Sequence, residues 1–240
     1  MPSPNNPTRY PAGVVNATQD GAWGNFLQPR PDLYTVFFDD FLTYTATNWV
    51  VTETDAGATQ TIVTAGLDGQ LALTNTAGGT DNVSLQWGPG GTTVATQFLW
   101  EATKDLVVST RFKLSAVVDQ AAVVGLAIAD TSPGASLPAN GIFFYKADGA
   151  AALIASVRKA GASTSVALGN MVADTFINVS LFYTAGDHTW RAFVNDTLIG
   201  SFSTLDVSPI VALAPTIGLL NGDTVANVLT IDRLIVAKQR

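Results

Sequence analysis

The stretch DLVVSTRFKLSAVVDQAAVVGLAIA, residues 105–129, decides the fold. In its first half, one set of alternate side chains is largely apolar and the other set is largely polar. This period of two is typical of a strand with one buried and one exposed face. The segment 118–120 interrupts the pattern, and residues 121–129 resume it as an almost wholly apolar strand. A long half-buried strand paired with a more buried one predicts the centre of a two-sheet sandwich.

The rest of the body repeats this pattern, and no segment shows a helical period. Short apolar or alternating runs are separated by turns rich in Gly, Asn and Asp, which indicates antiparallel strands. About fourteen strands are too many for one open sheet, so we expect two packed layers. One helical turn is expected near residues 171–175. The main expected strands cover residues 34–41, 49–54, 70–74, 82–87, 93–100, 106–115, 121–129, 141–146, 153–159, 163–168, 176–184, 189–194, 197–202, 217–220 and 228–236.

Residues 1–33 form a different kind of segment. Six of the 11 prolines lie here, and proline excludes both a helix interior and a central strand. Yet Tyr10, Trp23, Phe26 and Leu27 interrupt the segment, whereas a disordered linker usually lacks aromatic side chains. Two interpretations stay open. The arm packs on its own domain, or it lies extended across a neighbouring subunit with these four residues as its partner-binding anchors.

Composition excludes several classes of function. The net charge is −7, which argues against nucleic acid as a partner because phosphate binding relies on Lys and Arg. The chain has no cysteine, so disulfides, thiolate metal sites and cysteine nucleophiles are absent. No apolar run approaches the roughly 18 residues that a membrane span requires, and we expect no membrane partner. The first residues lack the apolar core of a secretory signal, so we expect synthesis in a cytoplasm.

Catalytic chemistry finds little support in the sequence. A glycosidase on such a sandwich needs two carboxyl groups facing each other across the substrate. The two glutamates, Glu53 and Glu101, lie on separate segments. Asp39 and Asp40 are adjacent, so on a strand they point to opposite faces, and we expect them to serve edge solvation and turn hydrogen bonds. The chain is therefore predicted not to be an enzyme, with no catalytic residues.

Metal and cofactor sites are likewise not predicted. His188, the single histidine, lies in a turn and is expected to be solvated. Calcium is bound through carboxylate and amide oxygens such as those of Asp and Asn, and Asp130, Asp148, Asp187 and Asp223 are loop-borne candidates. No local run brings several oxygen ligands close together, so we expect no metal ion and no cofactor.

Four tryptophans have two possible roles. Exposed aromatic rings serve as platforms for sugars in carbohydrate-binding modules, whereas in a sandwich such rings more often fill the core. The core role is the favoured interpretation for each of them. They are Trp49, Trp87, Trp100 and Trp190.

From residue 34 to the C-terminus the order of these pieces resembles the concanavalin-A-like jelly roll of laminin-G-like modules, legume lectins and many glucanases. This resemblance implies an all-β, two-sheet antiparallel jelly-roll sandwich over residues 34–240, with an extended N-terminal arm over residues 1–33. The phrases that carry it are FFDDF (37–41), LVVSTRFKLS (106–115), GLAIAD (125–130), GIFFYK (141–146), WRAFVNDTLIG (190–200) and IDRLIV (231–236).

The arm carries a second resemblance. RYPAGVVN (9–16), WGNF (23–26) and PDLYTVFFDDF (31–41) resemble a family of tailed-bacteriophage virion proteins in which a short proline-rich arm leads into such a jelly roll. This implies a decoration or cement protein on the outer capsid surface. Its partners would be the major capsid protein and further copies of itself, as a dimer or trimer. The alternative is a carbohydrate-binding module on a phage head fibre or tail appendage, with a glycan as its ligand.

Overall fold

The computed structural model describes residues 33–64, 69–203 and 208–240 of the chain. The regular secondary structure in these ranges is β-strand, apart from one short 3-10 turn, η1, at Ala46–Asn48. The helical turn expected near residues 171–175 is wrong, because that segment makes a non-helical turn between two strands. Within the described ranges, no helix is long and apolar enough to cross a membrane.

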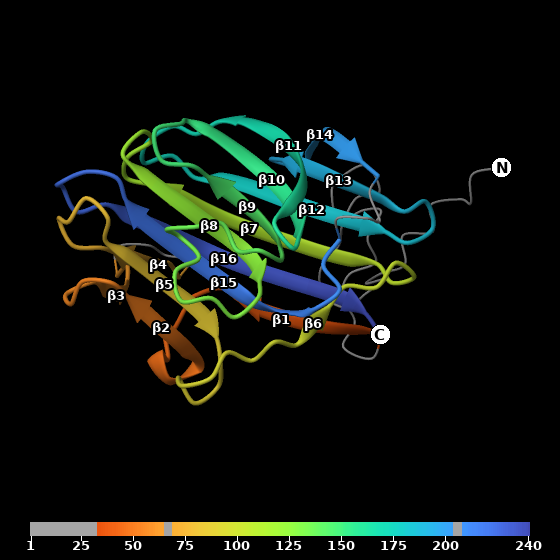
Figure 1. The fold of residues 1–240 in the computed structure, drawn as a ribbon, viewed down its shortest axis with the longest axis horizontal. Helices are drawn as coiled ribbons and strands as arrows, with labels where there is room; N and C mark the ends of the chain where they lie inside the picture. Colours follow the sequence, from red (N-terminus) through yellow and green to blue (C-terminus); the bar gives the residue numbers. More distant parts are fainter. Residues whose placement is uncertain (1–32, 65–68, 204–207) are drawn as a thin grey trace.

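The strands form two antiparallel sheets, which confirms the two predicted layers, and each sheet has eight strands. Figure 1 looks onto the faces of these sheets, so the strands of one overlie those of the other. Sheet A runs in the order β14 (Thr197–Phe202), β13 (Thr189–Val194), β12 (Ile177–Thr184), β7 (Leu106–Leu114), β16 (Val228–Gln239), β4 (Leu71–Thr74) and β3 (Thr59–Ile62), with β1 (Tyr34–Asp39) also paired to β16. Sheet B runs β11 (Ala162–Asn170), β10 (Ala152–Lys159), β9 (Gly141–Lys146), β8 (Gln120–Ala127), β15 (Ala212–Asn221), β5 (Asn82–Trp87) and β2 (Trp49–Glu53), with β6 (Phe98–Leu99) also paired to β15.

The two strands of the opening stretch lie at the centre, but not as a hydrogen-bonded pair. β7 lies between β12 and β16 in sheet A, and β8 lies between β9 and β15 in sheet B. The expectation that they pair is therefore wrong. The link between them crosses from one layer to the other, so each strand turns its apolar side chains toward the opposite sheet.

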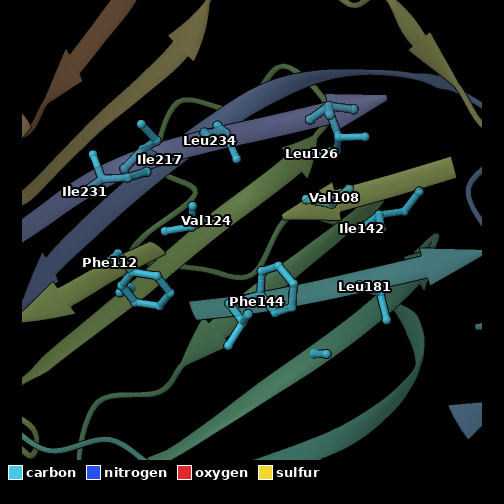
Figure 2. Close-up of a cluster of buried hydrophobic side chains, with 14 of the residues drawn as sticks. Val108, Phe112, Val124, Leu126, Ile142, Phe144, Leu181, Ile217, Ile231 and Leu234 are labelled. Atoms are coloured by element: carbon cyan, nitrogen blue, oxygen red, sulfur yellow. The ribbon is translucent and has the colours of Figure 1, made fainter. Parts of the chain in front are cut away.

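The core fills the space between the sheets. Figure 2 shows side chains from both layers meeting there, among them Val108 and Phe112 of β7 and Val124 and Leu126 of β8. All four are buried, and they belong to one continuous apolar cluster that spans the sandwich. Burying such side chains is the main favourable contribution to folding, since each removes apolar surface from water.

Strand β15 is longer than the sequence predicts, and it includes Pro215. A proline lacks a backbone donor and is normally excluded from central strands, so the sequence predicts only residues 217–220. On one edge of β15, the pairing with β6 ends at Leu213 and the pairing with β5 begins at Thr216. Pro215 lies opposite this gap, while the other edge pairs continuously with β8. The proline is tolerated because the ladder is interrupted at its position.

The arm anchors named above are outside the described residues. Tyr10, Trp23, Phe26 and Leu27 all precede Leu33, where the description of the chain begins. Their partner-binding role, and the boundary between the arm and the sandwich, stay predictions.

Candidate functional site

The outer face of sheet B is covered by the chain itself. The segment 128–140, between β8 and β9, lies over it and brings Pro133, Gly134 and Pro138 into buried positions. The side-chain amide of Gln86 in β5 donates to the Ile128 carbonyl at 2.8 Å, and its oxygen accepts from the Asp130 backbone at 2.8 Å. This face is therefore not an open platform for a ligand.

Small side chains make room for this covering segment. At Gly218 of β15, an added Cβ would lie 3.0 Å from the backbone nitrogen of Gly134. The strand and the covering segment therefore approach each other closely at these two glycines. The guanidinium of Arg158 donates to the Leu137 carbonyl at 3.0 Å and holds the far end of the segment. All eight residues of β8, the strand that precedes the segment, are buried.

An open pocket lies instead at one edge of the sandwich. It has a volume of about 370 Å³ and is formed by strand β1 of sheet A, strand β2 and the end of β5 in sheet B, and the loop that joins β1 to β2. The residues that line it are Val36, Phe37, Phe38, Asp39, Thr43, Thr45, Asn48, Trp49 and Trp87.

One wall of this edge pocket is aromatic. The half-buried Trp87 lies edge-on to Phe37 and to Trp49, with ring centroids 5.0 and 5.5 Å away. Phe37 and Trp49 are themselves edge-on at 5.9 Å. Edge-to-face pairs of this kind hold rings in fixed orientations. Trp87 therefore presents a rigid apolar surface at the pocket.

The pocket also has polar lining residues, and a turn positions them. The Asp39 carboxylate accepts a hydrogen bond from the Phe41 backbone at 2.9 Å. Phe41 adopts a left-handed backbone (φ 51°) and is fully buried against Trp49. This anchored ring fixes the loop from which Thr43, Thr45 and Asn48 reach the pocket. Nothing in the sequence pattern of residues 42–48 marks these polar residues as a site, because their proximity to Trp87 depends on the turn at Phe41.

The electrostatics of the pocket are set by Asp39. Burial raises the pKa of this carboxyl above its usual range; the hydrogen bond from Phe41 opposes the change and the charge of Asp40 adds to it. The carboxylate is thus a desolvated acceptor beside hydroxyl and amide groups. Such a combination of aromatic surface and a few polar groups is the composition of small-molecule pockets in general.

The four tryptophans differ in their burial. Trp49, Trp100 and Trp190 are buried in the core, which confirms the favoured interpretation for them. Trp87 is only partly buried and lines the edge pocket, so the second interpretation, an aromatic platform, stays open for it alone.

The carboxylates do not assemble into a catalytic pair. Glu53 is at the end of β2 that pairs with Val83, whereas Glu101 forms an ion pair with Lys238 at the opposite end of the sandwich. Asp39 and Asp40 accept hydrogen bonds from the backbone of Phe41 and Leu42, which confirms the predicted turn role.

The remaining candidates also occupy turns. His188 is exposed, has a left-handed backbone (φ 52°) and lies 2.9 Å from the Tyr183 hydroxyl, as expected of a turn residue. Asp187 forms an ion pair with Arg191, while Asp130 and Asp223 accept backbone hydrogen bonds from the turns that contain them. Across the described part of the chain, no three His, Cys, Asp or Glu side chains are grouped as metal ligands.

Comparison with known proteins places the fold. No protein-family model and no curated protein sequence matches the chain. Many solved structures resemble it, and three of them are described below. The Emp47p carbohydrate recognition domain is 13% identical, with a TM-score of 0.57 over 85% of this chain and 96% of that one. The β-glucanase of Bacillus licheniformis is 12% identical, with a TM-score of 0.55 over 84% and 97%. The endo-β-1,4-glucuronan lyase of Trichoderma reesei is 13% identical, with a TM-score of 0.55 over 83% and 94%.

The chain has the concanavalin-A-like jelly-roll fold. This confirms the fold class that the resemblance implied for the sandwich. Identities of 12–13% establish the fold alone. Whether the jelly roll binds a ligand or catalyses a reaction must be argued from its own residues.

Proposed function

We propose that this jelly roll is a carbohydrate-binding module whose ligand occupies the edge pocket. The observation that carries the proposal is that the half-buried Trp87 lines the same pocket as Asp39, Asn48 and two threonines. A sugar has apolar ring faces and hydroxyl edges, so it fits between an aromatic surface and hydrogen-bonding groups. Among the solved structures of similar fold, the Emp47p and Emp46p domains are described as carbohydrate recognition domains, which supports this class of ligand.

Replacing Trp87 by leucine is expected to weaken glycan binding about 30-fold or more. Truncating a buried aromatic contact in a binding site typically costs about 2 kcal/mol, and each 1.4 kcal/mol is a factor of ten. The full chain is first screened on a glycan array, and the affinity of the best ligand is then measured by titration calorimetry for both proteins.

Tyr145→Leu is the matched control, since Tyr145 is also a partly buried aromatic residue but lies on β9, outside the edge pocket. It is expected to leave the affinity unchanged. Equal losses in the two variants, or an array on which no glycan binds, would contradict the proposed function.

The edge pocket also predicts a pH dependence through Asp39. Asp39→Asn keeps an oxygen for the Phe41 hydrogen bond but removes the charge, and we expect it to weaken glycan binding about tenfold, the effect of a lost hydrogen bond to a charged group. Because burial raises the pKa of Asp39, the affinity of the unmodified chain should fall as the pH falls through that raised pKa. The affinity of the variant should stay flat over the same range.

Stability should respond to Asp39 with the opposite sign. A carboxyl whose pKa is raised by folding favours the folded state when it is protonated, so its contribution decreases as the pH rises through the raised pKa. Urea unfolding of the unmodified chain and of Asp39→Asn across the acidic range checks this. A difference in stability between the unmodified chain and Asp39→Asn that does not shift in favour of the unmodified chain as the pH falls would contradict the assignment.

A second candidate is the structural virion role that the resemblance of the arm implies. Such a protein would bind the major capsid protein on the outer capsid surface, as a dimer or trimer or beside adjacent copies. The observation that favours it is the exposure of large apolar side chains on sheet A, with Phe38 57% and Leu198 52% exposed. Exposed apolar surface is a common feature of protein contacts. Cosedimentation with undecorated capsids tests this role, and a protein that stays in the supernatant at every ratio would contradict it.

A further inference from the structure

The outer face of sheet A carries an unusual amount of apolar surface. A row of side chains crosses six neighbouring strands through directly paired positions, from Phe38 of β1 through Ile235, Ser109 and Ser180 to Phe193 and Leu198 at the far edge. The next row carries Val36, Ala237, Val107 and Phe182. We call these two rows the sheet A apolar face. A solvated sheet face is normally polar, so this face is built to be covered.

The centre of the sheet A apolar face is buried, whereas its margins are not. Ser109 is 0% exposed, although its neighbours Val108 and Thr110 occupy the inward side of β7. Its hydroxyl is 2.8 Å from that of Ser180, so the two buried polar groups satisfy each other in place of water. Val107 is fully buried in a small outward cluster whose described members all belong to sheet A. At the margins Phe38 and Leu198 remain about half exposed.

The N-terminal segment joins the sandwich at the edge of this face. Leu33 is held in place because its carbonyl accepts a hydrogen bond from the Arg240 backbone at 2.8 Å. The next residue, Tyr34, begins β1 and belongs to the outward cluster. The 32 residues that precede Leu33 therefore start from one margin of the sheet A apolar face. Six strands span about 25 Å, a distance that fewer than ten extended residues cover.

We propose that residues 1–32 of the same chain lie across the sheet A apolar face and cover its centre. Trp23, Phe26 and Leu27 are apolar side chains of the kind that pack against such a face. A segment tethered at the margin has a high effective concentration at its own face, which favours its own copy over a neighbour. The six prolines suit the role, because each removes a backbone N–H that pairing as a further strand would use.

The absence of cysteine allows a direct test in the full chain. Ser109→Cys places a single thiol at the centre of the sheet A apolar face, and its rate of reaction with a maleimide reports how often that centre is uncovered. In the same background, Trp23→Ser with Phe26→Ser should raise the rate about tenfold or more, because burial of two aromatic side chains is lost. Circular dichroism checks that the β-structure is unchanged.

Ser156→Cys is the matched control. Ser156 is also a buried serine in the middle of a strand, but it lies on β10 and its side chain points to the outside of sheet B. Its reaction rate should not respond to the two substitutions in the arm. A rate at residue 109 that also does not respond would overturn the proposal. A rate at residue 109 that rises when the protein is diluted would show that the arm of another copy covers the face, and would overturn the assignment to the same chain.

Discussion

Replacing Gly125 by alanine is expected to lower the free energy of unfolding by about 4 kcal/mol, or to prevent folding at physiological temperature. Gly125 lies in the middle of β8 with φ 151°, and an added Cβ would be 2.6 Å from the Ile142 carbonyl oxygen and 2.7 Å from the Phe143 Cα. Both atoms belong to the backbone of β9. That strand is itself paired with β10 on its other edge, so it cannot move aside without breaking a second ladder.

Gly149→Ala separates this collision from backbone strain. Gly149 also has a positive φ, 72°, but an added Cβ there would meet nothing within 4 Å. The substitution should therefore cost only about 1 kcal/mol, the strain of an alanine in a left-handed conformation. Urea denaturation of both variants and the unmodified chain measures the difference. Similar losses at the two positions would show that the contact with β9 is not what requires glycine at residue 125.

Replacing Asp81 by alanine is expected to cost about 3–4 kcal/mol of stability, since three donors would lose the charged acceptor that joins them. The side chain of Asp81 is buried and its carboxylate accepts hydrogen bonds from the Thr54 hydroxyl at 3.1 Å, the Asp55 backbone at 3.2 Å and the Thr76 backbone. These groups belong to the segment after β2 and the segment after β4. The carboxylate thus joins the ends of strands from different sheets.

The same residue predicts how stability depends on acid. Burial alone would raise the pKa of Asp81, but the hydrogen bonds from Thr76, Asp55 and Thr54 together lower it below its usual value. A group whose pKa is lowered by folding stabilises the folded state above its unfolded pKa of about 3.9, and this contribution is lost as the pH falls through the lower folded value. The unmodified chain should therefore lose stability below about pH 4 more steeply than Asp81→Asn. Urea unfolding at several acidic pH values measures the two slopes, and parallel curves would contradict the prediction.

The class of fold could be predicted from local patterns because a strand imposes a period of two on its side chains. The alternation from Leu106 to Leu114 and the apolar run after Gln120 mark real strands with nearly the expected ends. Turn residues mark the hairpins equally well: Asn195 and Asp196 both have positive φ between β13 and β14. Such signals depend on backbone geometry within a few residues, so they can be recognised from the local sequence alone.

The pairing between distant strands could not be predicted as well from the sequence. β16 contains a bulge between Ile231 and Arg233, after which Leu234 rather than Arg233 faces the core. The sequence shows only an interrupted alternation there. Likewise, the assignment of β7 and β8 to opposite sheets depends on how the link between them turns, and on which strands compete for each edge. These are properties of the assembled layers.

The candidate site shows the same division. The local sequence does not distinguish Trp87 from the core residue Trp190, since both lie in predicted strands. Only the position of β5 beside the edge strand β2 leaves the ring of Trp87 partly open. Only the left-handed turn at Phe41 brings Asp39 and the following loop to the same pocket.

By itself, the sequence determined that this chain forms an all-β sandwich without disulfides or a thiolate metal site, and that its first residues are of a different character from the rest. The tertiary structure decided which face the segment 128–140 covers, where a pocket stays open, and which outward sheet surface is apolar. The physical reason is the range of the interactions. Strand and turn preferences act within a few residues, whereas a pocket or an apolar face is made by side chains that only strand pairing brings together.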